Sequence, residues 1–443
     1  MRPLNLQQTL KNEIQLVRRQ LQQLDAEGLA RESGFLRRCP RKIPMAQFLL
    51  ALFALATESC LSLERIAATL SRLAQVAYTK QALRKRLTDK IEGFLARVAT
   101  QLFGRLPEAD AQLRGWLQPF RRVLLHDSTL QALPDHLAKF FPGSANGRAR
   151  TYASLKVQFI GDLLSSQVLH LSLSGFTRND QAAAPDILEV LEPGDLVIRD
   201  LGYFVIRAFQ CIQEKEAFFV SRGRADVKFY DARTGELIDL VAELRQHSSL
   251  DRQVLMGSQK LLVRLVAQPT PAEVGNERRR KAKSNRDRRC HPNAASLFLM
   301  GWNLMITNVP KSVWPAKALV AIYRLRWRVE MIFKAWKSHL GLRDLQCHCA
   351  RVLYLSVMTK LLFCVLVYRC CQALELLWGR ADRHVSLQRL ARIMGQWGCL
   401  IEAFLLQIPP EQWWEHTLTH HAFYEPRRDR KNYCEIIAVV TSK

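Results

Sequence analysis

The chain has 443 residues, enough for two to four domains that each bury a core of their own. Its 65 Lys and Arg residues outnumber 40 Asp and Glu residues, giving a net charge of +25, which predicts a polyanionic partner, either nucleic acid or an anionic membrane. The cysteine count of eleven is odd, and no secretory leader precedes the chain, which argues against a disulfide-stapled secreted protein and favours free thiols in a reducing cytoplasm.

The first 110 residues or so are expected to form a helical domain. Helical periodicity or continuous apolarity recurs at 7–24, 46–56, 62–73 and 80–87, with a basic, Pro-containing junction at 37–42. The last stretch carries four basic residues, Lys80, Arg84, Lys85 and Arg86. The last two stretches therefore suit a helix-turn-helix whose second helix lies in a DNA groove, although a plain helical bundle explains the same pattern equally well.

Two long apolar runs, at 45–63 and 352–368, raise the membrane alternative. The first contains Gln47 and Glu58, and the second has Lys360 near its middle, where a charge costs a few kcal/mol in a bilayer. We therefore expect buried helices of a soluble protein with no membrane partner. Cys347 and Cys349, on either side of a histidine, are too close in sequence for a four-ligand zinc site and are interpreted as structural.

Beyond residue 120 the apolar period becomes that of strands. Strands are expected at 123–127, 156–160, 167–173, 195–200 and 217–221, with helices following Asp180, which we expect to cap the first of them, and at 203–213. Two of the apolar strands end in a carboxylate, Asp127 and Asp200. This order predicts an α/β fold, a mixed sheet with helices on its faces.

Four dissimilar polar residues then recur along one presumptive helix: Tyr323, Arg326, Glu330 and Lys337. At 100° per residue they fall within an arc of about 60°, and the apolar residues of the same segment occupy the neighbouring arc. A solvated face with spaced charge pairs would explain the Glu and the Lys, but it does not explain the aromatic hydroxyl aligned with them.

Asp127, Asp200 and Glu330 acquire a joint interpretation. An Asp after a strand is usually a turn residue or a helix cap. Three carboxylates that converge at one end of a sheet, however, can hold two Mg²⁺ ions, which prefer oxygen ligands. Such a pair activates a nucleophilic oxygen and stabilises the leaving one in an in-line attack on phosphorus, which is nuclease or strand-transfer chemistry.

The motifs resemble those of bacterial DDE transposases, in the branch typified by insertion sequence four. That branch is marked by Tyr, two residues, Arg, three residues, Glu, six residues and Lys, a spacing that Tyr323 to Lys337 matches throughout. The segment 126–129, His-Asp-Ser-Thr, resembles the first catalytic Asp segment of the family, and 199–204 resembles the second. Trp302 and the phrase at 306–310 resemble what precedes the signature helix, so the resemblance covers roughly residues 30 to 345.

The resemblance implies a ribonuclease-H-like catalytic core with a mainly β insertion before the glutamate helix. The 130 residues between Asp200 and Glu330 exceed what one crossover needs, which requires such an insertion independently. We expect a DNA-binding domain at 1–110, core parts at 111–222 and 313–378, the insertion at 223–312 with strands at 227–230, 253–256 and 261–267, and a helical tail at 379–443, suited to dimerisation. The long apolar stretch at 353–377 is expected to be a helix on the core.

The resemblance also assigns roles. Asp127, Asp200 and Glu330 would ligate two Mg²⁺ ions, with Mn²⁺ as a substitute, while Arg326 and Lys337 would hold DNA phosphates. Tyr323 would donate to a phosphate oxygen, or equally to Arg326 or Glu330. Trp302 is the candidate for stacking a flipped base, against the plainer expectation of a core residue, and Trp327 lies beside the polar stripe, where it would contact DNA or close the edge of the site. The run at 278–289 has eight basic residues in twelve, including Arg278, Arg279, Arg280 and Lys281, and is expected to be a mobile loop that grips phosphates.

The predicted enzyme binds the terminal inverted repeats of a bacterial insertion sequence and acts in the cytoplasm, at the nucleoid. Water would cut each element end to leave a 3′ hydroxyl, which would then attack target DNA without ATP. Cutting two ends in one event favours a homodimer on DNA. Two alternatives remain at this level: a DNA-binding protein without catalysis, such as a decayed transposase acting as a repressor, and a metal-dependent nuclease without strand transfer.

Overall fold

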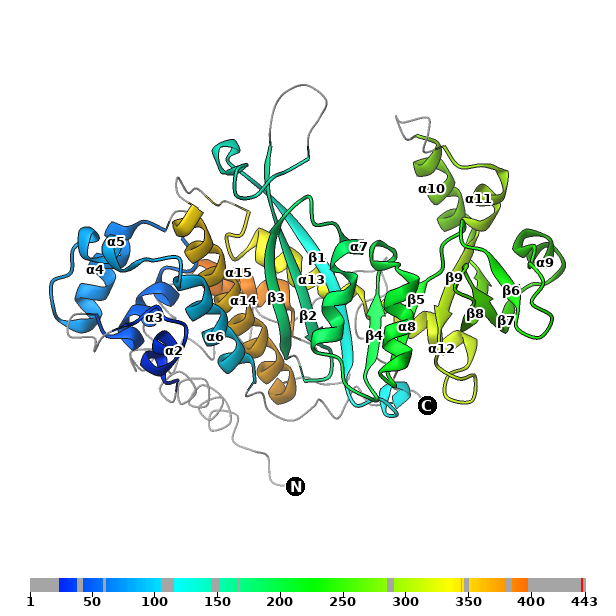
Figure 1. Cartoon of the computed structure of the whole chain (residues 1–443), viewed down its shortest axis with the longest axis horizontal. Helices are drawn as coiled ribbons and strands as arrows, with labels where there is room; N and C mark the ends of the chain where they lie inside the picture. The colour runs from blue at the N-terminus through cyan, green and yellow to red at the C-terminus, as the bar shows by residue number, and fades with distance from the viewer. Residues whose placement is uncertain are drawn as a thin grey trace.

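One mixed sheet runs through the middle of the molecule. The computed structural model of the chain describes residues 24–37, 43–58, 61–104, 115–144, 152–165, 167–284, 291–343, 345, 350–378, 385–396 and 440. Within these residues nine strands follow the order β3-β2-β1-β4-β5-β9-β8-β7-β6, with the N-terminal helices beyond one end and α9 to α11 beside the other (Figure 1). The α/β class expected from the sequence is confirmed.

The strands are β1 (Val123–Leu133), β2 (Ala153–Asp162), β3 (Val168–Gly175), β4 (Leu196–Arg199), β5 (Phe218–Arg222), β6 (Phe229–Asp231), β7 (Leu250–Met256), β8 (Leu261–Pro269) and β9 (Trp302–Thr307). All eight stretches that the sequence predicts as strands are strands here. β1 is longer than expected, because it continues for six residues past Asp127 in antiparallel pairing with β2.

The helices before the sheet are α2 (Ala26–Glu32), α3 (Met45–Ala54), α4 (Leu63–Ala74), α5 (Lys80–Arg86) and α6 (Ile91–Gly104). Those within and after it are α7 (Asp180–Ala183), α8 (Ile206–Glu214), α9 (Leu240–Gln246), α10 (Ala272–Lys283), α11 (Ala294–Leu299), α12 (Ala316–Arg324), α13 (Trp327–Ser338), α14 (Ala350–Trp378) and α15 (Leu387–Gln396). The expected helix at 7–24 lies almost wholly outside the described residues, as do the Cys347 and Cys349 pair and most of the tail.

The first five strands form a mixed half-sheet. β1 pairs antiparallel with β2, and β2 with β3, whereas β1, β4 and β5 run parallel. Their side chains alternate between two cores, so that Leu125 and Ile198 face α12, α13 and α14, while Leu124 and Val197 face α8 on the other side. The helices therefore cover both faces of this half.

The remaining strands extend the same sheet. β9 pairs antiparallel with β5 through three residue pairs, from Val220 opposite Thr307 to Arg222 opposite Met305, and β8, β7 and β6 follow outward. Thr307 and Asn308 reinforce the joint, since the Thr307 hydroxyl donates to the Phe219 carbonyl and the Asn308 amide donates to the Ala217 carbonyl. The strands predicted between 223 and 312 are thus joined edge to edge with the first half.

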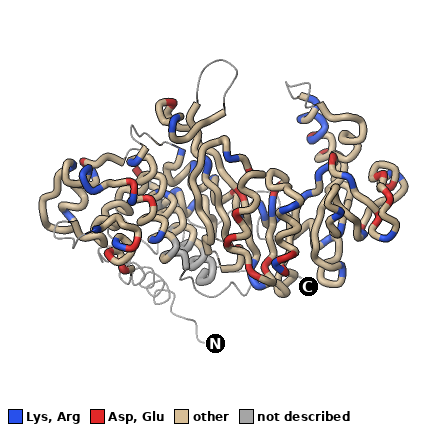
Figure 2. The backbone as a smooth tube through the Cα atoms, in the orientation of Figure 1, with Lys and Arg blue, Asp and Glu red and all other residues tan. Residues whose placement is uncertain are grey.

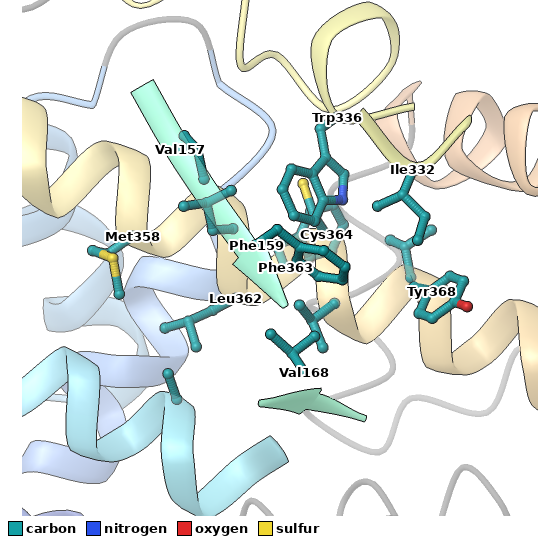
Figure 3. Packing of buried hydrophobic residues seen from close by; sticks show 14 of the residues in the cluster. Val157, Phe159, Val168, Ile332, Trp336, Met358, Leu362, Phe363, Cys364 and Tyr368 are labelled. Atoms are coloured by element: carbon teal, nitrogen blue, oxygen red, sulfur yellow. The ribbon is translucent and has the colours of Figure 1, made fainter. Parts of the chain in front are cut away.

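The main core lies between the sheet and the C-terminal helices. Figure 3 shows Phe159 of β2 beside Trp336 of α13 and Phe363 of α14, and Phe159 meets Trp336 edge to face with ring centroids 5.7 Å apart. The predicted helix at 353–377 is confirmed as α14, and Cys364 and Cys371 are buried in it. The packing between sheet and helices fixes α13 against β1.

A buried lysine ties the N-terminal helices to α14. Lys360, 1% exposed, donates to the carbonyl oxygens of Ala56 at 2.9 Å and Glu58 at 2.6 Å, just after α3 ends. Both carbonyls lie in the segment that follows α3, beyond its C-cap Leu55, so that Lys360 holds this segment against α14. Among the described residues, no helix combines the length and the apolarity that crossing a membrane requires.

Candidate active site

The sheet brings the first two predicted carboxylates to one edge. Parallel pairing of β1 with β4 ends at His126 opposite Arg199, so Asp127 and Asp200 are the next residues on adjacent strands. Alternation directs both toward the α12 and α13 face, since Leu125 and Ile198, two positions earlier, lie in the core on that face. Asp127 is mostly buried, and Asp200 is 40% exposed at its side chain.

The third carboxylate comes from α13, and here the structure corrects the sequence. The single helix predicted through Tyr323 and Lys337 is two helices, α12 and α13, separated by a tight turn at Leu325 and Arg326. In that turn the backbone bonds span three residues, from Leu325 to Ile322, from Arg326 to Tyr323 and from Val329 to Arg326, which tightens the spiral. Tyr323, Arg326 and Glu330 still lie at the Asp-bearing edge, whereas Lys337 reaches β1 further along, at the Leu130 carbonyl.

Arg326 contacts all three carboxylates. Its guanidinium donates to Asp127 Oδ2 at 3.1 Å and to Glu330 Oε1, and its Nε lies 3.8 Å from Asp200 Oδ1. Three acids that are separated by up to 203 residues, from 127 to 330, thus meet around one cation. Arg326 itself is 15% exposed at its side chain, so these contacts lie in a partly buried setting, where charge interactions are stronger than at the surface.

The electrostatics of the site reflect this crowding. Burial raises the pKa of Asp127 to about 6, with the carboxylates of Asp200 and Glu330 adding to the rise and Arg326 opposing it. Burial alone would lower the pKa of Arg326, but the charges of Asp200 and Asp127 and the hydrogen bond to Glu330 outweigh burial and raise it. The charge of Arg326 therefore favours the ionised form of Asp127, against burial and its two carboxylate neighbours.

The donor set fits a hard divalent cation. Three carboxylates offer only oxygen ligands, the type that Mg²⁺ and Mn²⁺ select. Among the described residues, however, no group of three Asp, Glu, His or Cys side chains is already spaced to hold an ion. At this site the guanidinium of Arg326 stands among the carboxylates, so an ion would have to take its place.

Tyr323 and Lys337 contact the protein and not each other. The Tyr323 hydroxyl donates to Asp200 Oδ1 at 3.0 Å, a partner that the sequence did not suggest, and burial followed by the charge of Asp200 raises its pKa. Lys337 Nζ donates to the Leu130 carbonyl of β1 at 2.7 Å. Trp327 is 54% exposed beside them. The edge of the site is thus lined by groups that can reach solvent.

A cavity of about 650 Å³ opens beside Asp200. Its wall includes the turn at Leu201 and Gly202, three arginines and the side of Trp302, the arginines being Arg222, Arg224 and Arg278. Trp302 is half-buried at the start of β9 and packs on Phe298, with ring centroids 6.3 Å apart. It therefore lines the cavity while also contacting the core, and stacking of a flipped base on it stays a prediction.

The basic run at 278–289 begins in a helix, contrary to the predicted loop, because it continues the pattern of α10 through Lys283; residues 285–290 lie outside the described part. Arg278 donates to the Trp302 carbonyl and to Asn303, and Arg279 donates to the Leu297 carbonyl. Arg280 and Lys281 pair with Glu277 and are about three-quarters exposed. Two of these four cations thus hold the chain around Trp302, and the other two are exposed on α10. Figure 2 shows the Lys and Arg positions along this helix in blue.

One acid beside the site has another role than the sequence suggested. Asp180 does not cap α7, because Asn179 is the N-cap and accepts from Ala182 N. The Asp180 carboxylate instead binds Ser128, next to Asp127, and Lys156 of β2. The only signal for Asp180 in the sequence was a polar residue before a helix, which is the usual mark of a cap.

Comparison of the sequence with models of known protein families identifies the family of the chain. A family model described as Transposase DDE domain matches residues 118–366, more than half of the chain. The chain belongs to the DDE transposase family. The matched span begins just before β1 and ends inside α14, so that it includes Asp127, Asp200 and Glu330. The family predicted from the motifs is confirmed.

Relatives of this DDE transposase are transposases of bacterial insertion sequences. The transposase for insertion sequence element IS231B of Bacillus thuringiensis subsp. berliner is 27% identical over 353 residues, which cover 73% of each chain. The transposase for element IS1151 of Clostridium perfringens is 25% identical over 336 residues, 70% of each chain. As a DDE transposase, the protein is an enzyme that cleaves and transfers DNA strands.

Proposed function

We propose that the protein is the transposase of a bacterial insertion sequence that binds terminal inverted repeats and moves the element by cut-and-paste, with Asp127, Asp200 and Glu330 as its catalytic metal ligands. The observation that carries the proposal is the meeting of these three acids around Arg326. A catalysis-free DNA-binding protein would have no need for three carboxylates held together at the cost of burial.

The proposed catalytic core is ribonuclease-H-like and corresponds to β1 to β5 with α7, α8, α12 and α13. Its support is the order β3-β2-β1-β4-β5, with antiparallel pairing on one side of β1 and parallel pairing on the other. We retain 111–222 and 313–378 as its two parts, 223–312 as the insertion, 1–110 as a DNA-binding domain and 379–443 as a tail suited to dimerisation.

The metal site we propose takes two Mg²⁺ ions, with Mn²⁺ as a substitute. Asp127, Asp200 and Glu330 would be its ligands, and a bound pair would supply activation of the attacking oxygen and charge stabilisation at the scissile phosphate. Tyr323, through its hydrogen bond to Asp200, orients that ligand. Water would cut each end to leave a 3′ hydroxyl, and that hydroxyl would then attack the target strand.

We propose that Arg326 exchanges partners when DNA arrives. Its planar guanidinium matches a phosphate as well as it matches carboxylates, so it can neutralise the acids in the free protein and bind DNA once metal has taken its place. Lys337, which reaches β1 from α13, would meet a phosphate as a point charge. Trp327, exposed on the same side, is placed to contact DNA at the edge of the site.

The cavity beside Asp200 is the proposed subsite for a nucleotide at the element end. Trp302 offers a ring for stacking, while Arg222 and Arg224 offer charge for a phosphate. Replacing Trp302 by Ala should weaken processing of the cut end while Phe restores it. Arg278 and Arg279 would support this wall, and Arg280 and Lys281, with the basic face of α5, would bind DNA backbone without sequence preference.

The deciding experiment incubates the protein with Mg²⁺ and a plasmid that carries the cognate element, in the dimeric state we expect on DNA. Cleavage followed by joined products supports the proposal, cleavage alone indicates a nuclease without strand transfer, and binding alone indicates a repressor. Glu330→Gln should abolish cleavage while sparing DNA binding, because it removes one charge without changing shape. Cleavage by Glu330→Gln at the parental rate would remove Glu330 from the active site.

We further propose that the protein acts in the cytoplasm, at the nucleoid.

A further inference from the structure

We propose that Asp180 is a positioning residue for the catalytic centre, acting through Ser128 on Asp127 and through Gly202 on the turn that follows Asp200. This inference rests on the proposed role of Asp127 and Asp200 as metal ligands. Asp180 lies on the face of the sheet opposite to the one that those two side chains occupy, and it contacts the segment that carries each of them.

The contact with the Asp127 strand runs through Ser128. Asp180 Oδ1 accepts a hydrogen bond from Ser128 Oγ at 2.7 Å, and the backbone N–H of Ser128 donates to Asp127 Oδ1 at 2.8 Å. Ser128 is therefore held on one side of the strand by Asp180 while its own amide holds the Asp127 carboxylate. A shift of Ser128 would change the direction of that amide and hence the orientation of Asp127.

The contact with the Asp200 turn runs through Gly202. A Cβ atom built on Gly202 would lie 2.9 Å from Asp180 Oδ2 and 3.3 Å from the Asp180 Cβ, closer than side chains normally approach. The backbone of the turn after Asp200 therefore lies directly against the Asp180 side chain. A single carboxylate touches both of the segments that the proposed metal ligands belong to.

A lysine completes the arrangement. Lys156 of β2, 8% exposed, forms an ion pair with Asp180 Oδ1 at 2.6 Å. The same oxygen thus binds an ammonium and a hydroxyl, which limits the side chain to one orientation. Because Asn179 already caps α7, this carboxylate is not needed for the helix. The pair is only partly buried, since the Asp180 side chain is 32% exposed, so it is a weak source of stability and is better suited to specifying one arrangement.

The test replaces Ser128, which avoids breaking the ion pair. Ser128→Ala removes the hydroxyl that joins Asp180 to the Asp127 strand, together with its contact to Tyr203, and Ser128→Thr keeps a hydroxyl. We expect Ser128→Ala to raise the Mg²⁺ concentration for half-maximal plasmid cleavage by about tenfold, the range seen when residues that orient metal ligands are lost. The rate at saturating Mg²⁺ should stay within about twofold, and Ser128→Thr should restore the parental Mg²⁺ curve.

Two further variants sharpen the result. Asp180→Asn should shift the Mg²⁺ curve in the same direction as Ser128→Ala, while Ser154→Ala, a hydroxyl deletion at a buried position of β2, should leave it unchanged. Binding of Mn²⁺ to the DNA-free protein, measured by electron paramagnetic resonance, should weaken in parallel with the cleavage curve. If Asp180→Asn fails to fold, the Ser128→Ala and Ser128→Thr pair decides alone.

Two variants distinguish the positioning role of Asp180 from the metal-ligand role of Asp127. A parental Mg²⁺ curve and parental Mn²⁺ binding in folded Ser128→Ala would overturn the positioning role, as would a lowered melting temperature with no change in either. Asp127→Asn serves as the reference, because full cleavage and full Mn²⁺ binding by that variant would instead overturn Asp127 as a metal ligand. Loss of both in Asp127→Asn together with a shifted curve in Ser128→Ala supports both statements.

Discussion

Removing the charge of Arg326 should strengthen metal binding by the DNA-free protein, the reverse of what loss of a residue in an active site usually does. In the free protein its guanidinium contacts Asp127, Asp200 and Glu330, so that it competes with a divalent ion for the same oxygens. Arg326→Gln removes the competitor and leaves the carboxylates in place.

The contacts set the size of the effect. A hydrogen bond to a charged group contributes about 1.5–3 kcal/mol, and Asp200 and Glu330 are exposed enough for water to screen part of that, so we take about 1–2 kcal/mol for the competition. Each 1.4 kcal/mol is a factor of ten, which predicts Mg²⁺ binding about five- to thirtyfold tighter. The metal-free variant should also melt at a lower temperature, because three acids then lack their cation.

Calorimetric titration of Mg²⁺ into DNA-free protein at pH 8.5 measures the effect, because this pH lies well above the pKa of about 6 of Asp127. Arg324→Gln is the matched control. It removes the same charge at a position two residues before Arg326, where the side chain is exposed at the end of α12. Equal or weaker Mg²⁺ binding by Arg326→Gln, with the control unchanged, would refute the competition.

Four more outcomes are expected. At limiting Mg²⁺ the cleavage rate should fall below about pH 6, where Asp127 takes up a proton, and the midpoint should move to lower pH as Mg²⁺ rises, because metal binds only the ionised form; a midpoint independent of Mg²⁺ would contradict this. In EDTA, the same raised pKa means that stability should increase as pH falls from about 6 toward 4, which pH-dependent melting would show. Lys360→Met should lower the free energy of unfolding by about 1–3 kcal/mol in denaturant titrations, because the carbonyls of Ala56 and Glu58, just after α3, lose this donor. Met358→Leu, a change of similar volume on the same helix, should alter it little. Replacing Arg84 and Lys85 of α5 by Gln should reduce the slope of log affinity against log salt by about one for each phosphate that α5 no longer neutralises, and an unchanged slope would exclude α5 from the DNA interface.

The positions of Asp127 and Asp200 were predictable because strand alternation and strand ends are local properties of a sequence. Each Asp comes at the equivalent position of an apolar strand in the alternation of side chains. Once the two strands pair as parallel neighbours, the two carboxylates therefore lie at the same edge and on the same face of the sheet. The Tyr323 to Lys337 spacing similarly placed four polar groups on one side of a helical segment. The tight turn at Leu325 and Arg326 does not appear in a wheel that assumes a constant 100° per residue.

The remaining features depend on partners distant in the chain. Arg278 and Arg279 were expected to meet phosphates, but their donors satisfy carbonyls at the C-terminal end of α11 and the start of β9, which charge patterning cannot reveal. β9 itself went unrecognised as a strand, because its place in the sheet depends on pairing with β5 and β8. Asp180 precedes a helix in the sequence as a helix cap would, but its side chain contacts Ser128 of β1 and Lys156 of β2.

The edge-to-edge joint between β5 and β9 has a mechanical consequence. A hinge between the two halves of the sheet would have to separate three residue pairs and break the side-chain hydrogen bonds of Thr307 and Asn308 at the same time. Most of the residues involved are buried. Trp302 starts β9, and the turn after Asp200 follows β4, so both belong to one continuous sheet. Their separation can change only if the pairing of β5 with β9 is disrupted. A substrate that contacts both would therefore have to match the spacing that this continuous sheet sets.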